Sequence, residues 1–575
     1  MKYVLGISCG YHDSAAALVR DGKVLGACEE ERFTGIKHDS SFPTNTIEWL
    51  METYNITPEN LHAICFYENP KEKLDRIEKS IKKKPKKWYD IIYNNRKSIL
   101  NRNIKSYKDI ENKIKKLCGK NTEVYYSDHH QSHLAYSYYT SPFQHSAILS
   151  VDGVGEWETT CLGFGTINTV QKMGSINFPH SLGMLYSSFT AFLGFKPNEG
   201  EYKVMGLAPY GDSKVYKEKF NKLVTKNKNG TFEINMEYFT YEYDDKSMFN
   251  EKLGKLFEIP NRLPEDELTQ QHKDIAAGLQ SLYEELFFNL LDVLYKQANS
   301  DNLCLSGGCA YNGTANGKIL QKTKFKKLYI PPAPSDAGSA IGCALDYHYK
   351  NCNSRAAEIR VMNNIPYLGP GYKQDDVLDA IQKYSSEIWA DKKLKEQIVD
   401  IIAQEIKDGN VVGWFDGRME FGARALGNRS ILANPRDPQM KSRLNRMIKK
   451  REGFRPFAPI VTEEFSKVYF RYEDTVPYMN QVVKVKPEHA KNLPSITHVD
   501  SSARIQTLNK NQHKYIYALL TKLQQINGYP IVINTSFNLK DQTMVLTPED
   551  AIKTFLNCEM DVLVIHNYII KKKIL

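Results

Sequence analysis

The sequence predicts a two-domain α/β protein. Two segments, residues 3–19 and 147–164, share one layout: a short apolar run, a turn rich in Gly and Asp, and a second apolar run. A third segment, at 303–308, is a strand that leads through two glycines towards a helix. Mixed strands and helices of this kind are typical of α/β domains. Because 575 residues exceed one ordinary core, we place a domain boundary in the aperiodic, Asn-, Ser-, Pro- and Gly-containing stretch 350–372.

The composition excludes several classes of protein. With 41% hydrophobic and 25% charged residues, the chain is not expected to be disordered. The most apolar stretch, Phe287–Leu294, contains Asn289 and Asp292, so no run of about 18 apolar residues exists to span a membrane. The N-terminus lacks the apolar core of a signal peptide, and ten cysteines without a CxxC pair fit reduced thiols. We therefore expect a cytoplasmic protein.

The first predicted element is a strand at Tyr3–Ile7, followed by a polar turn with His12 and Asp13 and by a second strand, Ala15–Val19. The later copy of this layout has Asp152-Gly153 in its turn. A nucleotide-binding fold built from two similar halves has such a duplicated hairpin, with each turn facing phosphate, so Gly153 is a candidate ligand-binding position.

The positive charge of the chain is concentrated in one segment. The whole chain has a net charge of +10, whereas Lys71–Lys120 alone holds 15 Lys and 3 Arg against 6 acidic residues, a net of +12. Its apolar residues recur at helical spacing: Ile77, Ile81, Ile110, Ile114 and Leu117. We interpret the segment as amphipathic surface helices with a solvated basic face; a patch for nucleic acid or a membrane surface is the alternative.

Two histidines stand four residues apart. Ser127 or Asp128 can cap a helix from which His129 and His133 project on one face, a spacing that suits two imidazoles on one metal ion. Position 130 is His, so the general-base Glu of a metalloprotease motif is absent. Asp152 and Asp336 lie in Gly-flanked turns and complete a near-neutral ligand set, which allows iron, manganese or zinc.

The longest predicted helix runs from about Glu265 to Gln297 and leads into the strand Leu303–Leu305. Gly307 and Gly308 follow, and another helix begins near Asn312. Because glycines let backbone N–H groups approach a ligand closely, this arrangement indicates a phosphate or nucleoside site; a plain tight turn is the alternative.

The second domain is also predicted to be α/β. Ile398–Ile406 has helical periodicity, and Val411–Phe415 is a strand. Thr547-Pro548 is a helix start with a capping hydroxyl, and Asp561–Ile565 is a final strand.

The same domain contains clustered basic residues. The loop Gly417–Ser430 carries three arginines among glycines, and Lys449, Arg455 and Arg504 follow. Guanidinium groups pair bidentately with phosphate or carboxylate, and lysine adds a compact charge. We therefore expect a site for a small, multiply charged anion rather than ordinary surface arginines.

Several longer blocks resemble the NodU/CmcH family of O-carbamoyltransferases, including the tobramycin carbamoyltransferase type. They are His12–Ala16, Glu29–Phe33, Gly194–Ala208, Ser306–Ala310, Gly417–Ser430, Phe454–Pro459 and Asn534–Asn538, and the resemblance spans essentially the whole chain. One departure stands out: where the family commonly has Arg-Gly-Glu-Pro, this chain has Lys540-Asp541-Gln542-Thr543.

The resemblance implies two domains. Residues 1–355 would form a Kae1-like domain of the actin/sugar-kinase/Hsp70 type, with a Lys-rich helical insertion at about 70–120, and residues 365–575 a YrdC-like domain. The C-terminal domain would make carbamoyladenylate and pyrophosphate from carbamoyl phosphate and ATP, the latter with Mg²⁺. The N-terminal domain would then transfer the carbamoyl group to a hydroxyl of a small-molecule acceptor, such as a sugar or natural product.

The resemblance also assigns roles to residues. It places a divalent metal, Fe²⁺ by analogy with the best-understood member of the family, on His129, His133, Asp152 and Asp336. It places the nucleotide on Gly307, Gly308 and Asn312. It places acceptor-side catalytic groups at His12 and Lys37. It places carbamoyl phosphate and adenylate on Lys449, Arg455 and Arg504, with Arg418, Asn534 and Ser536 nearby. His12, with a reference pKa near neutrality, is our candidate general base.

Two other functions use similar domains: a threonylcarbamoyl transferase acting on tRNA, and an ATP-dependent kinase of the same superfamily. We favour the small-molecule carbamoyltransferase. A kinase does not explain the metal quartet or the second, basic domain, and the fusion of both domains in one chain favours the small-molecule enzyme over the tRNA enzyme. We expect no nucleic-acid or membrane partner, and a homodimer is the default assembly.

Overall fold

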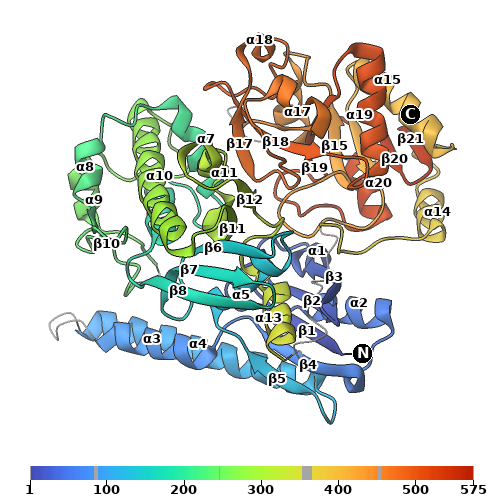
Figure 1. The fold of residues 1–575 in the computed structure, drawn as a ribbon. Coiled ribbons are helices and arrows are strands. Elements are labelled where there is room, and N and C mark those ends of the chain that lie inside the picture. Colours follow the sequence, from blue (N-terminus) through green and yellow to red (C-terminus); the bar gives the residue numbers. More distant parts are fainter. Residues whose placement is uncertain (1, 83–88, 245, 352–365, 451–454, 574–575) are drawn as a thin grey trace. The chain divides into compact units, whose positions relative to one another are not determined.

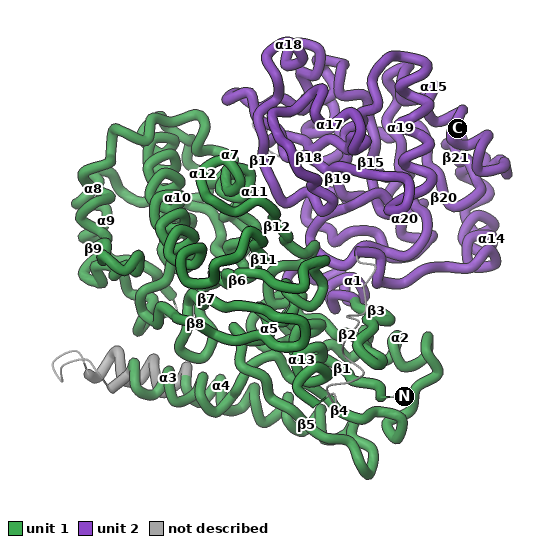
Figure 2. Tube along the Cα trace, in the orientation of Figure 1, with its two compact units in different colours: residues 1–27, 40–363 green, residues 28–39, 364–575 purple. Residues whose placement is uncertain are grey.

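A computed structural model describes residues 2–82, 89–244, 246–351, 366–450 and 455–573, with the backbone only for 81, 82 and 89–99. The chain forms two compact units (Figure 2). The N-terminal unit comprises residues 1–27 and 40–363, and the C-terminal unit comprises residues 28–39 and 364–575. Both combine helices with sheets, so the prediction of a mixed α/β protein is confirmed.

The first sheet of the N-terminal unit has five strands (Figure 1). In spatial order they are β3 (Lys23–Glu29), β2 (Ala15–Arg20), β1 (Tyr3–Ser8), β4 (Leu61–Phe66) and β5 (Glu123–Tyr126). The central strand β1 pairs antiparallel with β2 and parallel with β4, and β4 pairs parallel with β5.

The second sheet repeats this connectivity. Its strands are β8 (Thr169–Asn177), β7 (Glu158–Thr166), β6 (His145–Val151), β11 (Asn302–Ser306) and β12 (Lys327–Tyr329). Strand β6 pairs antiparallel with β7 and parallel with β11, as β1 pairs with β2 and β4. The two hairpins expected from the sequence therefore occupy equivalent places in two sheets.

Two helices pack together in the N-terminal unit: α5 (His129–Tyr139), which is buried along its whole length, and α13 (Asp336–Asn351). Helix α13 also crosses β1 and β2. Its small residues permit this contact, because a Cβ on Gly342 would lie 2.0 Å from the carbonyl oxygen of Ser132. The close packing positions the first turn of α13 beside α5.

Helix α10 (Gln270–Ala298) lies in an extensive apolar core, to which it contributes Phe287 and to which α6 contributes Phe189. The helix begins five residues later than the sequence indicated. Thr269 and His272 form a capping box that ends the preceding loop, so the acidic residues 265–267 are not helical. The remaining helices and strands of this unit are α2 (Thr44–Tyr54), α6 (Leu182–Phe192), α7 (Glu201–Leu207), α8 (Lys217–Asn221), β9 (Val224–Lys226), β10 (Phe232–Ile234), α9 (Glu251–Phe257), α11 (Gly313–Asn316) and α12 (Ile319–Lys322).

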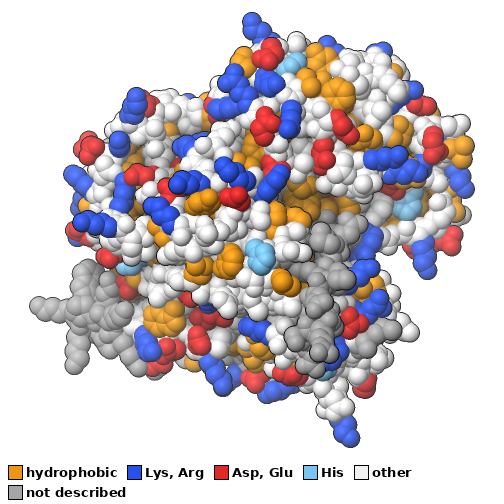
Figure 3. Space-filling model, viewed as in Figure 1, with side chains coloured by type: hydrophobic (Ala, Val, Ile, Leu, Met, Phe, Trp, Pro, Cys, Tyr) orange, Lys and Arg blue, Asp and Glu red, His pale blue; other side chains and the backbone are white. Residues whose placement is uncertain are grey.

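The Lys-rich segment forms two helices, α3 (Pro70–Lys82) and α4 (Tyr89–Leu117). Ile110 and Ile114 are buried, as their spacing indicated, while the side chain of Ile81 lies outside the described residues. Exposed lysines of the segment form (i, i+4) ion pairs, such as Lys115 with Glu111 at 2.9 Å. On the face drawn in Figure 3, basic and acidic side chains are interspersed outside the grey residues.

The C-terminal unit is built on a mixed nine-stranded sheet. Its strands, in spatial order, are β13 (Ile388–Lys392), β21 (Tyr568–Lys572), β20 (Val562–Ile565), β14 (Val412–Phe415), β15 (Arg429–Ala433), β19 (Ile531–Ser536), β16 (Ala458–Thr462), β18 (Ser502–Leu508) and β17 (Gln481–Lys484). Helices α15 (Lys395–Lys407) and α19 (Lys514–Asn527) pack together over the buried side chain of Trp414. The other helices are α1 (Glu31–Thr34), α14 (Gln374–Lys383), α16 (Met440–Arg443), α17 (Glu463–Tyr469), α18 (Pro487–Ala490) and α20 (Pro548–Leu556).

Residues 28–39 differ from the expected division of the chain, since they group with the C-terminal unit instead of the N-terminal one. The cause is a buried polar contact. Glu29 accepts a hydrogen bond from the Gly422 N–H at 2.7 Å, and Arg32 donates to the Gly422 carbonyl at 3.0 Å. Most of the predicted boundary stretch 350–372, namely residues 352–365, lies outside the described residues.

No helix in the described part of the chain combines the length and apolar character needed to cross a bilayer. The described cysteines form no disulfide.

Candidate functional site

Three elements of the N-terminal unit bring four metal-type ligands together. Asp128 caps α5 by accepting the Gln131 N–H at 3.0 Å, which starts the helix so that His129 and His133 share a face. Asp152 follows the last residue of β6, and Asp336 is the first residue of α13. All four side chains are buried.

The ligand atoms lie within 4.8 Å of one another. Asp152 Oδ2 lies 3.0 Å from His129 Nε2 and 2.9 Å from His133 Nε2, and Asp336 Oδ1 lies 3.8 and 3.5 Å from the same two nitrogens. Metal–ligand bonds of about 2.0–2.2 Å place neighbouring ligands about 3–3.5 Å apart, so the quartet fits a divalent ion. The structure thus brings together the same four residues that the sequence predicted.

The electrostatics of the quartet is that of two imidazoles facing two carboxylates. Burial alone would lower the pKa of His129, but the hydrogen bond to Asp152 and the charge of Asp336 raise it to about 10. Burial would raise the pKa of Asp152, but hydrogen bonds from both imidazoles hold it well below its usual range. The carboxylate of Asp152 therefore stays anionic, and in the metal-free protein His129 carries a proton that a metal must displace.

The second carboxylate oxygen of Asp152 is held by the backbone. Asp152 Oδ1 accepts the N–H groups of Gly153 at 2.8 Å and Gly308 at 3.2 Å. Gly307 has φ +84° and ψ 161°, a region open essentially to glycine alone, and a Cβ there would lie 2.2 Å from the Val151 carbonyl oxygen. The Gly-Gly turn expected to meet a phosphate thus also orients a ligand carboxylate.

Two polar groups around α5 complete this arrangement. His130 is bonded to Ser150 Oγ at 2.9 Å and to the Glu158 carbonyl at 3.1 Å, and burial together with the two neighbouring imidazoles holds its pKa well below the usual range. Glu156 accepts the N–H of His129 at 3.1 Å. Burial, and next the Asp128 charge, raise the pKa of Glu156 to about 7.

His12 lies in the turn after β1, with Nδ1 3.1 Å from Asp13 Oδ2. Burial opposes its protonation, but the charges of Asp13 and Asp336 raise its pKa to about 9. The effect of Asp336 shows that His12 belongs to the electrostatic environment of the quartet. Asn312 caps α11 through Ala315 at 3.1 Å and exchanges hydrogen bonds with Gln280 at 3.0 and 3.1 Å, so its amide is engaged within the protein.

The C-terminal unit contains a buried lysine surrounded by oxygen atoms. Lys449 follows a π-helical turn (Leu444–Ile448) and is 4% exposed. Its Nζ lies 2.5 Å from the Ser536 carbonyl, 3.2 Å from Ser536 Oγ, and 3.0 and 2.7 Å from the carbonyl and Oδ1 of Asn538. The structure therefore joins two sequence-predicted residues, Lys449 and Ser536, and adds Asn538.

Buried side chains hold the arginine-rich loop in place through hydrogen bonds to backbone groups. Arg429 is fully buried, stacks 3.6 Å from the ring centroid of Phe415 and donates to the Asp416 carbonyl at 2.8 Å. Arg418 donates to the Gly369 carbonyl at 3.0 Å and also to that of Leu368. Glu420 accepts three backbone N–H groups between residues 426 and 429 at 2.7–3.1 Å. Arg418 and Arg429 therefore hold the loop in shape through backbone carbonyl groups. The sequence could not distinguish this structural role from ligand binding.

The other candidates lie on neighbouring strands. Asn534 on β19 donates to the Ala425 carbonyl at 2.9 Å and to Gln506 on β18 at 3.0 Å. Arg504 is half-buried on the same strand β18, and Arg455 is half-buried just before β16. Because β18, β16 and β19 are adjacent in the sheet, one region of the C-terminal unit carries the predicted basic residues.

Comparison with known proteins identifies the family. A family model described as "Carbamoyltransferase N-terminus" matches residues 3–345, and one described as "Carbamoyltransferase C-terminus" matches residues 403–572. The chain belongs to the carbamoyltransferase family. The carbamoyltransferase is 40% identical to the uncharacterized protein sll1178 of Synechocystis sp., over 100% of this chain and 97% of that protein. It is 33% identical to the nodulation protein NolNO of Sinorhizobium fredii, over 98% of this chain and 79% of that protein.

Two solved structures align with part of this carbamoyltransferase at low TM-scores. Component A of the (R)-2-hydroxyglutaryl-CoA dehydratase of Acidaminococcus fermentans aligns with a TM-score of 0.31 at 14% identity, over 61% of this chain and 98% of that one. T. kodakarensis HypF aligns with a TM-score of 0.30 at 12% identity, over 61% and 48%. Values this low extend no function to the carbamoyltransferase.

Two residues beside the predicted site residues, Glu156 and Asn538, were not predicted from the sequence. Glu156 follows the Asp152–Gly155 turn directly, and Asn538 closes the Asn-Thr-Ser-Phe-Asn block, so sequence signals existed for both. Lys37, expected beside His12, is exposed and belongs to residues 28–39 of the C-terminal unit.

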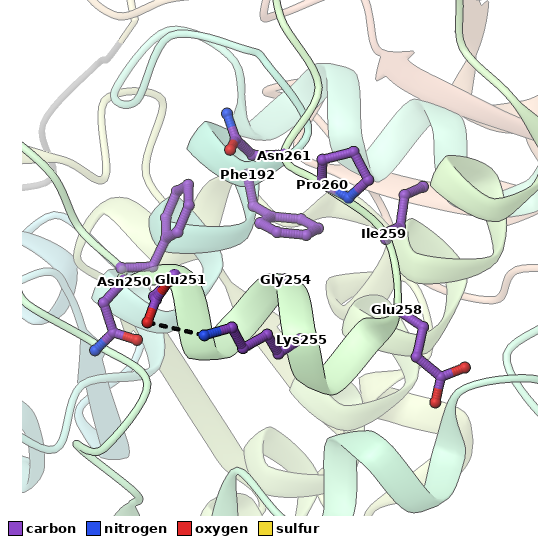
Figure 4. Close-up of a pocket in the computed structure, with 10 residues that line it drawn as sticks. Phe192, Asn250, Glu251, Gly254, Lys255, Glu258, Ile259, Pro260 and Asn261 are labelled. Atoms are coloured by element: carbon purple, nitrogen blue, oxygen red, sulfur yellow. Dashed lines mark ion pairs between the residues drawn. The ribbon is translucent and has the colours of Figure 1, made fainter.

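A cavity of about 600 Å³ beside α9, lined by Phe192, Lys255 and Pro260 among others, involves none of the predicted site residues (Figure 4).

Proposed function

We propose that this carbamoyltransferase works through two half-reactions, one in each unit. In the C-terminal unit, carbamoyl phosphate, ATP and water yield carbamoyladenylate, pyrophosphate and phosphate. In the N-terminal unit, an acceptor hydroxyl attacks the carbamoyl carbon, its proton leaves, and AMP departs. The observation that carries this proposal is the pair of unlike buried clusters, a His/Asp quartet in one unit and a lysine among oxygens in the other.

The C-terminal cluster suits the adenylation step. Carbamoyl phosphate and ATP are both anionic and repel each other, so the step needs fixed cations that hold the reacting atoms in line. Lys449 is held in place by Ser536 and Asn538. Arg504 on β18 and Arg455, just before the adjacent strand β16, extend the positive charge. We infer that this unit is YrdC-like and binds ATP with Mg²⁺.

The N-terminal quartet suits the transfer step. His129, His133, Asp152 and Asp336 would hold a divalent cation, iron being the one that the family resemblance implies. When bound, such an ion supplies Lewis-acid polarisation of an oxygen on the transferred group. His12, oriented by Asp13, would take the proton of the acceptor hydroxyl when it is in its neutral form, and its pKa of about 9 makes that form more abundant as the pH rises. We infer a Kae1-like domain from the shared connectivity of the two sheets.

The two half-reactions can be separated by experiment. We expect Lys449→Met to abolish pyrophosphate exchange that depends on carbamoyl phosphate, while the exposed Lys467→Met retains it. Removing the metal should leave exchange intact but stop transfer, measured as an acceptor mass gain of about 43 Da, carbamoyl replacing hydrogen. Exchange that survives Lys449→Met, or transfer that survives complete metal removal, would contradict the proposal.

A further inference from the structure

The quartet histidines differ at the ring nitrogen that faces away from the ligand cluster. His133 Nδ1 has a partner, Ser339 Oγ, at 3.1 Å. His129 Nδ1 is buried and has no hydrogen-bond partner among the described residues. The Oε2 atom of Glu68 lies 4.0 Å from this nitrogen.

Metal-bound imidazoles almost always donate their second N–H to an acceptor, which fixes the ring and strengthens the ligand. A metal on Nε2 of His129 would leave the proton on Nδ1. The contact with Glu68 is then about 1 Å longer than a hydrogen bond, a distance that a small ring or side-chain rotation closes.

Glu68 is itself fixed in place by the Lys-rich helices. Its side chain is buried, and the ammonium of Lys73 on α3 donates to both carboxylate oxygens at 2.9 and 2.8 Å. The hydroxyl of Tyr107 on α4 donates to Oε1. Lys73 and Tyr107 thus fix the carboxylate of Glu68 in place, and its oxygen atoms are able to accept the Nδ1–H of His129.

We propose that Glu68 is the outer carboxylate of His129, and that Lys73 and Tyr107 are positioning residues that hold it there. The helices α3 and α4 thereby support the metal centre through side chains on their buried face. This role does not depend on the exposed lysines of the two helices. This inference rests on the proposed metal centre and names the residues that tune it.

The test is a Co²⁺ titration of the full-length, metal-free protein, followed by the visible absorption of the bound ion. Loss of an outer-shell partner weakens metal binding by about 10-fold to 100-fold. We expect a loss in this range for Glu68→Gln and a smaller loss for Tyr107→Phe, which removes only one hydroxyl. Lys115→Met, an exposed lysine of α4 that pairs with Glu111, is the matched control and should bind Co²⁺ as the wild type does.

The thermal midpoint of each metal-free variant separates support of the metal from support of the fold. An affinity loss in Tyr107→Phe with an unchanged metal-free midpoint supports the inference, even where Glu68→Gln fails to fold. Wild-type Co²⁺ affinity in both variants would overturn the inference and leave the metal centre standing. A wild-type protein that binds no Co²⁺ would overturn the metal centre itself.

Discussion

Replacing Asp152 by Asn should remove metal binding while preserving the fold. In the structure one carboxylate oxygen accepts two backbone N–H groups, and the other faces both imidazoles. The amide of Asn is nearly isosteric, so its oxygen can keep the backbone hydrogen bonds. Its NH₂ group then points at the imidazoles, where an anionic ligand is needed.

The size of the effect follows from linkage. A ligand present at 1,000 times its Kd stabilises the folded state by about 4 kcal/mol. At roughly 2 °C per kcal/mol for a unit of this size, the wild type should gain about 8 °C in Tm when metal is added. Asp152→Asn should gain less than about 1 °C, because the binding term disappears.

Scanning fluorimetry with and without Co²⁺ measures both quantities. The matched control is Asp346→Asn, a buried aspartate of α13 that accepts from Gln131 at 2.8 Å and pairs with Lys350 at 2.8 Å. It should lower Tm but keep the metal-induced gain. A full gain in Asp152→Asn would refute the assignment of Asp152 as a ligand.

Two further predictions concern the same centre. Since the pKa of His129 is raised to about 10 in the metal-free protein, it is protonated at neutral pH, and metal uptake must release a proton. The apparent Co²⁺ affinity should therefore rise by up to about tenfold per pH unit between pH 6 and 8, and an affinity independent of pH in calorimetry would contradict this. Gly307→Ala should lower the free energy of unfolding by more than about 3 kcal/mol in urea, because it strains a positive φ and meets the Val151 carbonyl. Gly174→Ala, whose Cβ would meet nothing within 4 Å, is the control, and equal stability of the two variants would count against the strain argument.

The grouping of His129, His133, Asp152 and Asp336 could be predicted because each of these residues carries a local signal. His129 and His133 have helical spacing after a capping Asp128, and Asp152 and Asp336 stand at element ends flanked by small residues. Element ends in α/β folds meet in space, so local signals sufficed to assemble the set.

The roles of the basic residues could not be predicted in the same way. Arg418 and Arg429 look like anion ligands in the sequence, yet both donate to backbone carbonyls within their own unit. A guanidinium group serves either purpose, and only the positions of the surrounding carbonyl groups decide which. The same holds for Glu68, whose sequence neighbours give no sign of its partners on α3 and α4.

The sequence alone determined the α/β class, the duplicated hairpins, the carbamoyltransferase resemblance and the four candidate ligands, because periodicity, capping and glycine turns act over a few residues. Tertiary structure alone decided that residues 28–39 group with the C-terminal unit, that the Gly-Gly turn holds a carboxylate, and that a Lys-rich helix pair reaches Glu68. These outcomes depend on which groups become buried together, and burial fixes hydrogen-bond partners across distances in sequence that no local pattern records.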